Sequence, residues 1–269
     1  MIVNNRDGLL LKRHHHLDER DWRSDATYKL IFSPFGKTEY QLNKGDISIG
    51  ENEFVIFNPN EEHKQLKATR EKFLVEIQPS LLQKTAEQLG IKLLEPEFSL
   101  LSYRHPQIIQ WTSFIRDFLI MNEDANPMPN QLFLENSLTQ VSILMLQYGA
   151  GSHQSQFPTI ISKENINDVI NALKESYQEE WTLDQMSTIA RMGKYQFAHL
   201  FKKETGLSPY SWLQLYRLFK TQRALLFTNQ SILTIALEHG FTSVSSYNHL
   251  FKKVYRKTPT EFRFIHSNS

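Results

Sequence analysis

The chain has 269 residues and no cysteine. The absence of cysteine excludes disulfides and thiolate metal sites, and it agrees with the reducing cytoplasm, where we expect the protein to act. No apolar run approaches the roughly 18 residues that a membrane span requires, so we expect no membrane partner. The short run Leu9-Leu10-Leu11 has charged neighbours and no cleavage-like tail, which is not typical of a signal peptide.

Signatures of catalysis are also lacking. The sequence contains no nucleophile elbow, phosphate-binding loop, HExxH motif or paired-carboxylate motif. We therefore expect a protein that is not an enzyme and has no cofactor. Hydrophobic residues make up 40% of the chain and charged residues 22%, as in soluble globular proteins. The length is enough for two domains of about 150 residues each.

A strong overall charge is missing, but the charges are unevenly distributed. The formal net charge is +1. Residues 1–162 hold 16 Lys and Arg against 20 Asp and Glu, whereas residues 163–269 hold 14 against 9. From Gln185 onward, 12 basic residues stand against 3 acidic ones. This local excess favours a phosphate-rich partner over a merely solvated basic face.

The first hundred residues have the pattern of short strands. Runs rich in branched and aromatic side chains are separated by turn formers, which is typical of a small sandwich or barrel. The runs are 28–32, 46–49, 53–57 and 73–77. Helical spacing of apolar residues then predicts helices at about 106–121 and 131–148. In the second of these helices, Leu134, Leu138, Val141 and Met145 form an apolar stripe.

A small, polar segment at 149–161 predicts a linker. We thus expect an α+β chain with three parts: a domain at 1–148, the linker, and an all-helical domain at 162–269. In the last part, Thr182, Ser208 and Ser243 are predicted N-caps, and Pro209 supports a helix start at that position. A single long helix is predicted from about Pro209 to Phe227.

The helical domain contains the same unit twice. His199-Leu-Phe-Lys-Lys203 returns fifty positions later as His249-Leu-Phe-Lys-Lys253. Pro209 and Pro259 follow at the same offset. Two copies are too few for a solenoid, so the repeat indicates two supersecondary elements. Two helix-turn-helix units on one long helix would present their second helices about one DNA turn, ~34 Å, apart.

The outward faces of the two predicted recognition helices are suited to double-stranded DNA. Each combines hydrogen-bonding or planar groups near its first turns with lysines further along, as base edges and phosphates respectively require. The predicted DNA-binding residues are Lys194, Tyr195, Gln196, Ala198, His199, Lys202, Ser245, Ser246, Asn248, His249 and Lys252.

Residues 163–266 resemble the DNA-binding domain of AraC/XylS-type transcription regulators. The resemblance depends on 201–209, Ile235-Ala236 with Gly240-Phe241, 246–253 and 258–263. It implies seven helices with two helix-turn-helix motifs. By motif position, it also implies base contacts from Tyr195, Ala198, His199, Ser245, Ser246, Asn248 and His249. The chain departs from the family pattern in the first turn, where Arg191 replaces the usual glycine and Gly193 replaces the usual capping serine.

The front domain resembles, less closely, the cupin-like effector and dimerisation domain of such regulators. The resemblance implies a small-molecule effector, a homodimer and RNA polymerase as a partner. The implied dimer forms through the helices at about 106–121 and 131–148, and we expect the helix at 131–148 to form the interface, although its stripe could equally be buried within the monomer. The candidate effector-binding residues, for an anion or a sugar, are His14, His16, Tyr28, Tyr40 and His63.

Other functions remain open at this point. His14 and His16 would share a face of a strand, and with His63 they could hold a divalent metal. The usual metal-cupin spacing is not reproduced, so our main prediction has no metal. The alternatives are a metal-dependent cupin enzyme fused to a helical domain, an interaction protein, and a regulator that uses its front domain only to dimerise. The leading hypothesis is a sequence-specific DNA-binding regulator, expected to be an activator.

Overall fold

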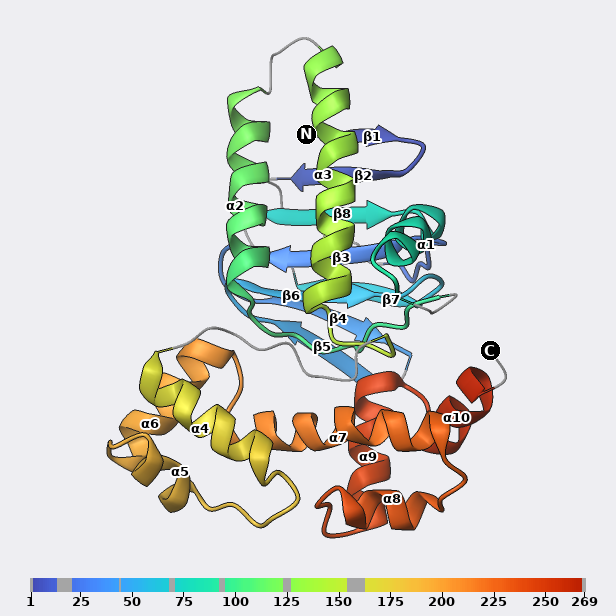
Figure 1. Cartoon of the computed structure of the whole chain (residues 1–269). Coiled ribbons are helices and arrows are strands. Elements are labelled where there is room, and N and C mark those ends of the chain that lie inside the picture. The colour runs from blue at the N-terminus through green and yellow to red at the C-terminus, as the bar shows by residue number, and fades with distance from the viewer. Residues whose placement is uncertain are drawn as a thin grey trace. The chain divides into compact units, whose positions relative to one another are not determined.

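The computed structural model describes residues 2–13, 21–43, 45–67, 71–91, 95–122, 127–153 and 163–267. The chain divides into two compact units, Met1–His153 and Gln154–Ser269. Figure 1 shows the strands in the first unit, and the second unit is helical in its described part. The α+β class predicted from the sequence is confirmed.

Two antiparallel sheets form the centre of the first unit. The larger has five strands, in the order β1 (Ile2–Asn5), β2 (Gly8–Arg13), β8 (Lys72–Ile77), β3 (Tyr28–Ser33) and β6 (Glu53–Phe57). The smaller has three, in the order β5 (Gly45–Ile49), β4 (Thr38–Leu42) and β7 (His63–Lys67). In the described part of the chain, no named strand of one sheet pairs with a strand of the other, so these strands form an open sandwich and not a closed barrel.

The core of the sandwich comes from alternate residues of both sheets, because side chains on a strand alternate between its faces. The larger sheet contributes Ile31, Val55, Phe57 and Leu74, and the smaller contributes Tyr40, Leu42, Ile47 and Ile49. Leu11 of β2 packs against the edge of this cluster. The sequence predicted β3, β5, β6 and β8, and it missed the other four strands.

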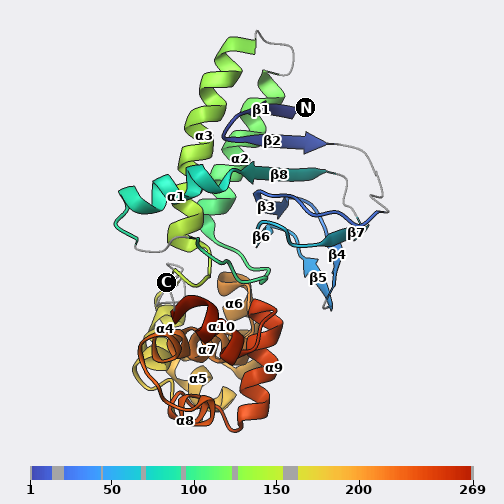
Figure 2. The ribbon, with the colours of Figure 1, turned by 90° about the vertical axis from the view of Figure 1, so that its right-hand side faces the viewer.

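Helices α2 (Pro106–Met121) and α3 (Pro127–Tyr148) pack on the opposite face of the larger sheet, and α1 (Pro79–Gln88) packs against α3 (Figures 1 and 2). The rings of Phe73 on β8 and Trp111 on α2 meet edge to face at 6.4 Å. The apolar stripe of α3 is buried completely within the chain, at Leu134, Leu138, Val141 and Met145. This stripe is therefore a core element of the chain, one of the two outcomes that the sequence left open, and a dimer interface on this helix stays a prediction.

Residues 149–153 of the predicted linker belong to the first unit, and the rest of that prediction, 154–161, lies outside the described residues. Gly149, Ala150 and Ser152 are buried. Two backbone hydrogen bonds attach the segment to an earlier loop, from Ser99 N to Ala150 O at 2.8 Å and from Ser152 N to Glu97 O at 2.8 Å. The first unit thus continues to His153.

Seven helices make up the described part of the second unit. They are α4 (Glu164–Glu175), α5 (Leu183–Ile189), α6 (Lys194–Thr205), α7 (Pro209–Phe227), α8 (Ile232–Glu238), α9 (Val244–Tyr255) and α10 (Pro259–Ser267). Helix α7 has the predicted bounds and is buried along most of its length. Its 19 residues extend about 28 Å. None of the described helices has both the length and the apolarity to cross a membrane.

Candidate nucleic-acid interface

Helices α5 and α6 form the first helix-turn-helix motif. Thr182 caps α5 in a reciprocal capping box with Gln185, as the sequence predicted. Phe197 and Phe201 of α6 are fully buried. The ring of Phe201 meets Trp212 of α7 edge to face at 6.3 Å, which attaches the recognition helix to the long helix. One face of α6 is therefore packed in the core of the second unit, and the opposite face is exposed to solvent.

The exposed face of α6 carries the residues predicted to bind DNA. The side chain of Tyr195 is 93% exposed. Ala198 is half-buried, and the others are exposed, namely Lys194, Gln196, His199 and Lys202. The ammonium of Lys194 forms an ion pair with Asp184 of α5, with Nζ and Oδ1 2.5 Å apart. Asp184 was not predicted as a member of this surface, and it partly neutralises the first cation of α6.

Helices α8 and α9 form the second motif, and Ser243 caps α9. The Ser243 hydroxyl accepts a hydrogen bond from Ser246 N at 3.2 Å. Tyr247 and Phe251 are fully buried. The Tyr247 hydroxyl donates to Thr221 Oγ1 of α7 at 3.0 Å, so this recognition helix is also attached to the long helix.

The exposed face of α9 again contains the predicted residues. The exposed members are Ser245, Ser246, Asn248, His249 and Lys252. The Ser246 hydroxyl donates to Ser243 O at 2.8 Å, so it already takes part in the cap. Asn248 and His249 therefore carry the most available directional groups on this helix.

The turns of the two motifs have related backbones but different residues. Arg191 has φ 54° and Gly240 has φ 82°, and each lies one residue beyond the C-cap of its helix. A left-handed residue with a hydrogen bond reaching back five residues is a Schellman ending. That bond runs from Met192 N to Ser187 O in the first motif and from Phe241 N to Ala236 O in the second. Arg191 therefore adopts a positive φ where the family usually has glycine, and the first turn, 190–193, is one residue shorter than the second, 239–243.

Any side chain at position 240 would clash with neighbouring atoms. A Cβ at this position would lie 2.7 Å from Gln178 O and 2.9 Å from Arg217 Nε. Arg217 itself donates to Tyr177 O at 2.6 Å and to Glu179 O at 2.5 Å. The glycine is thus required both by its backbone conformation and by this close approach.

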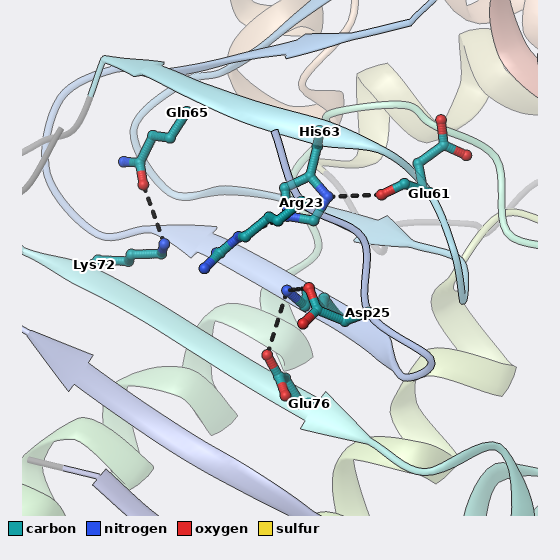
Figure 3. A network of polar contacts seen from close by, with 8 residues as sticks. Arg23, Asp25, Glu61, His63, Gln65, Lys72 and Glu76 are labelled. Atoms are coloured by element: carbon teal, nitrogen blue, oxygen red, sulfur yellow. Dashed lines mark hydrogen bonds and ion pairs between the residues drawn. The ribbon is translucent and has the colours of Figure 1, made fainter. Parts of the chain in front are cut away.

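The first unit contains a second candidate site, a polar cluster between its sheets (Figure 3). The polar cluster consists of Arg23, Asp25, Lys29, His63, Gln65, Lys72 and Glu76. Lys29 is buried and pairs with Asp25 and, at 3.4 Å, with Glu76. Lys72 Nζ donates to Gln65 Oε1 at 3.1 Å. Gln65 Nε2 is buried and has no hydrogen-bond partner among the described residues.

His63 is held in this cluster as a neutral ring. Burial lowers the pKa of His63 to about 4. Its Nδ1 is 2.7 Å from Glu61 O, and its Nε2 accepts from Arg23 Nε at 3.3 Å. Both ring nitrogens therefore have protein partners.

The predicted effector residues are only partly brought together. The rings of Tyr40 and His63 are 6.1 Å apart. Tyr28 is separate from them, because its hydroxyl donates to Pro96 O and its ring contacts Phe98. Tyr28 and Lys29 are adjacent on β3 and so point to opposite faces of the sheet. His14 and His16 lie outside the described residues. The described residues contain no group of three His, Asp or Glu side chains suited to hold a metal.

Comparisons with known proteins agree with the geometry of the second unit. A family model described as a helix-turn-helix domain matches residues 186–264. The Tn10 transposon protein TetD of Escherichia coli is 33% identical over 108 residues, which cover 40% of this chain and 75% of TetD. The chain belongs to the AraC/XylS family of transcription regulators.

Two further similarities cover more of the chain. The regulator MtrA of Neisseria gonorrhoeae is 25% identical over 173 residues, 62% of this chain and 56% of MtrA. The chain thus spans about half the length of that AraC/XylS-type relative. A solved structure of ToxT from Vibrio cholerae O395 matches 97% of this chain and 99% of its own, with 12% identity and a TM-score of 0.38.

Proposed function

We propose that this protein is a sequence-specific DNA-binding transcription regulator whose helices α6 and α9 enter two successive major grooves of one duplex. The proposal depends chiefly on one observation. Two helix-turn-helix motifs, both attached to α7, present exposed residues able to contact bases and phosphates. The length of α7, about 28 Å, is close to the ~34 Å between neighbouring turns of the groove.

The direct test is footprinting of genomic fragments with the full chain, followed by binding measurements on the protected site. We expect affinity to fall steeply with salt concentration, because lysines that neutralise phosphates release counterions. Replacement of both Asn248 and His249 by alanine is expected to remove much of the preference for the operator over random DNA. Unchanged discrimination in this variant would contradict the assignment of α9 as a recognition helix.

We also propose that the polar cluster receives a small effector with hydrogen-bond acceptors, such as an anion or a sugar. The buried Gln65 Nε2 supports this proposal, because a buried donor without an acceptor is costly and a ligand oxygen would satisfy it. Tyr40 and His63 border the same region. The effector residues proposed on structural grounds are thus Gln65, Lys72 and Arg23, in addition to these two.

The effector proposal can be tested by thermal unfolding of the full chain in the presence of sugars and small organic acids. A ligand that binds the native state raises the Tm with concentration. The Gln65→Met variant keeps most of the side-chain volume and removes both donor and acceptor, so it is expected to lose the shift. Equal shifts in the variant and the natural chain would place the ligand elsewhere.

We propose that the regulator is a dimer that forms through the exposed sides of α2 and α3. The buried stripe of α3 is not available, but four large apolar side chains remain exposed on this pair of helices: Phe114 at 58%, Ile120 at 47%, Met121 at 82% and Leu132 at 64%. Sedimentation analysis of the Leu132→Glu variant tests this surface, with Ile2→Glu as an exposed control on β1. A monomeric natural chain would overturn the proposal.

The remaining parts of the proposal come from the family resemblance: a cytoplasmic activator that contacts RNA polymerase. A reporter gene placed downstream of the protected site tests whether the protein activates or represses transcription. Deletion of an activator lowers the expression of the reporter. No observation favours the alternative of a metal-dependent enzyme, since both ring nitrogens of His63 already have protein partners.

A further inference from the structure

We propose that Arg191, in the turn of the first motif, binds a phosphate of the DNA backbone and that its strained conformation is retained for this contact. The inference rests on the proposed DNA-binding function and adds a residue at a position where the family usually has a glycine. It concerns affinity and register, because phosphate contacts carry no direct information about base sequence.

The backbone of Arg191 points to a function. Its φ of 54° lies in the left-handed region, which glycine adopts freely and arginine adopts only at a cost. The equivalent position in the second motif, Gly240, is a glycine. Residues held in such conformations tend to cluster at functional sites, and the inference properly runs from the observed strain to a function.

Backbone hydrogen bonds hold the turn, from Arg191 N to Thr188 O at 3.0 Å and from Met192 N to Ser187 O at 3.2 Å, but no contact of the Arg191 side chain compensates for this strain. The Arg191 side chain is exposed, and its guanidinium has no hydrogen bond, ion pair or ring contact within the described residues. The neighbouring cation behaves differently, because Lys194 is paired with Asp184. Arg191 is therefore a cation close to the start of α6 that has no ion-pair partner among the described residues.

The position of Arg191 suits a backbone contact. It lies three residues before Lys194, the first residue of α6, whose N-terminal turns carry the predicted base contacts. In a helix-turn-helix the first helix crosses the DNA backbone while the second enters the groove, so the turn between them lies near phosphates. The guanidinium fork matches a phosphate with two parallel hydrogen bonds. Asp184 repels phosphate at this edge, and Arg191 restores the positive charge there.

Two substitutions distinguish the effect of the guanidinium charge from the effect of the backbone strain at position 191. Arg191→Gln removes the charge and keeps a Cβ at positive φ, whereas Arg191→Gly removes both the charge and the strain. Arg6→Gln is the matched control, because Arg6 is an exposed arginine of the first unit, with 92% of its side chain accessible. Each full-length variant is titrated with the footprinted operator and with random DNA at several salt concentrations, and its Tm is measured.

Both Arg191 variants are expected to bind operator about three- to tenfold more weakly, with the slope of log K against log salt reduced by about 0.9. The ratio of operator to random binding stays unchanged. Arg191→Gly raises the Tm and Arg191→Gln does not, while Arg6→Gln matches the natural chain in every measurement.

Two results would overturn the inference without touching the proposed function. One is an Arg191→Gln variant with natural affinity and salt slope, while the Asn248 and His249 double variant loses discrimination. The other is a loss of binding in Arg191→Gly alone, which would assign the effect to the shape of the turn. If the natural chain shows no salt-dependent DNA binding, the proposed function and this inference both fail.

Discussion

The two helix-turn-helix motifs of this chain share a plan but differ in how their recognition helices are held. Helix α9 begins at a serine cap and follows a turn that only glycine can occupy. Helix α6 has Gly193 as its N-cap residue and so lacks a side-chain cap, follows a strained arginine, and has its first lysine paired with Asp184. Both helices are attached to α7 by buried aromatic residues.

This difference suggests that the two motifs have different roles in DNA binding. The second motif is built for a well-defined helix start, which directional hydrogen bonds to bases require. In the first motif, the turn and the N-cap stabilise the helix start less, and the turn carries an exposed positive charge. Strain at such positions is retained where something compensates for it, and we propose that the contact of Arg191 with a DNA phosphate does so.

The largest expected effect is that of Gly240→Ala. A Cβ here meets the carbonyl oxygen of Gln178 and forces a positive φ on alanine. We expect the free energy of unfolding to fall by about 3 kcal/mol. Denaturant unfolding measures it, with Arg191→Ala as the control, because that position already carries a Cβ at positive φ. Equal losses at the two turns would remove the distinction between them.

Specificity should also differ between the motifs. The paired replacement of Asn248 and His249 by alanine is expected to reduce the operator-to-random ratio about tenfold more than the paired replacement of Tyr195 and His199. The reason is that α9 carries directional groups at its predicted base positions, whereas one such position of α6 is Ala198. Competition binding at fixed salt measures both ratios, and equal losses would argue for equal roles.

The cap of α9 provides a smaller effect. Ser243→Ala removes the acceptor for Ser246 N and is expected to cost about 1 kcal/mol of unfolding free energy. Denaturant unfolding checks this value. Ser243→Asn, which retains a side-chain acceptor, should recover most of the loss.

The smallest expected effect is a gain at the equivalent cap of α6. A Cβ at Gly193 would meet nothing within 4 Å, and its φ of −67° suits any residue. Gly193→Ser should therefore stabilise the chain by a few tenths of a kcal/mol. A destabilised variant would show that the missing cap has another cause.

Features that depend on neighbours in the chain could be predicted well. The caps at Thr182, Ser208 and Ser243 follow from side chains that reach backbone groups three residues away. The bounds of α7 follow from Pro209 and an apolar pattern that continues to Phe227. The exposed residues of α6 and α9 follow from helical periodicity, because the buried aromatic residues determine which face is left outside.

Features that depend on distant partners were predicted less well. The stripe of α3 has the same pattern whether it packs in its own chain or against a second copy, and the structure buries it in the monomer. Tyr28 was grouped with Tyr40 and His63, although the alternation of side chains along β3 turns it to the other face of the sheet. Strands β4 and β7 were missed because polar residues alternate with buried ones in them.

By itself the sequence determined the tandem motifs, their outward residues and the helix that joins them, because local hydrogen bonds and helical spacing act over only a few residues. The tertiary structure alone decided which apolar faces meet within the chain, that Lys194 is paired with Asp184, and that the buried Nε2 of Gln65 has no hydrogen-bond partner among the described residues. These outcomes depend on groups from distant parts of the chain, and a local sequence pattern does not determine which distant groups come into contact.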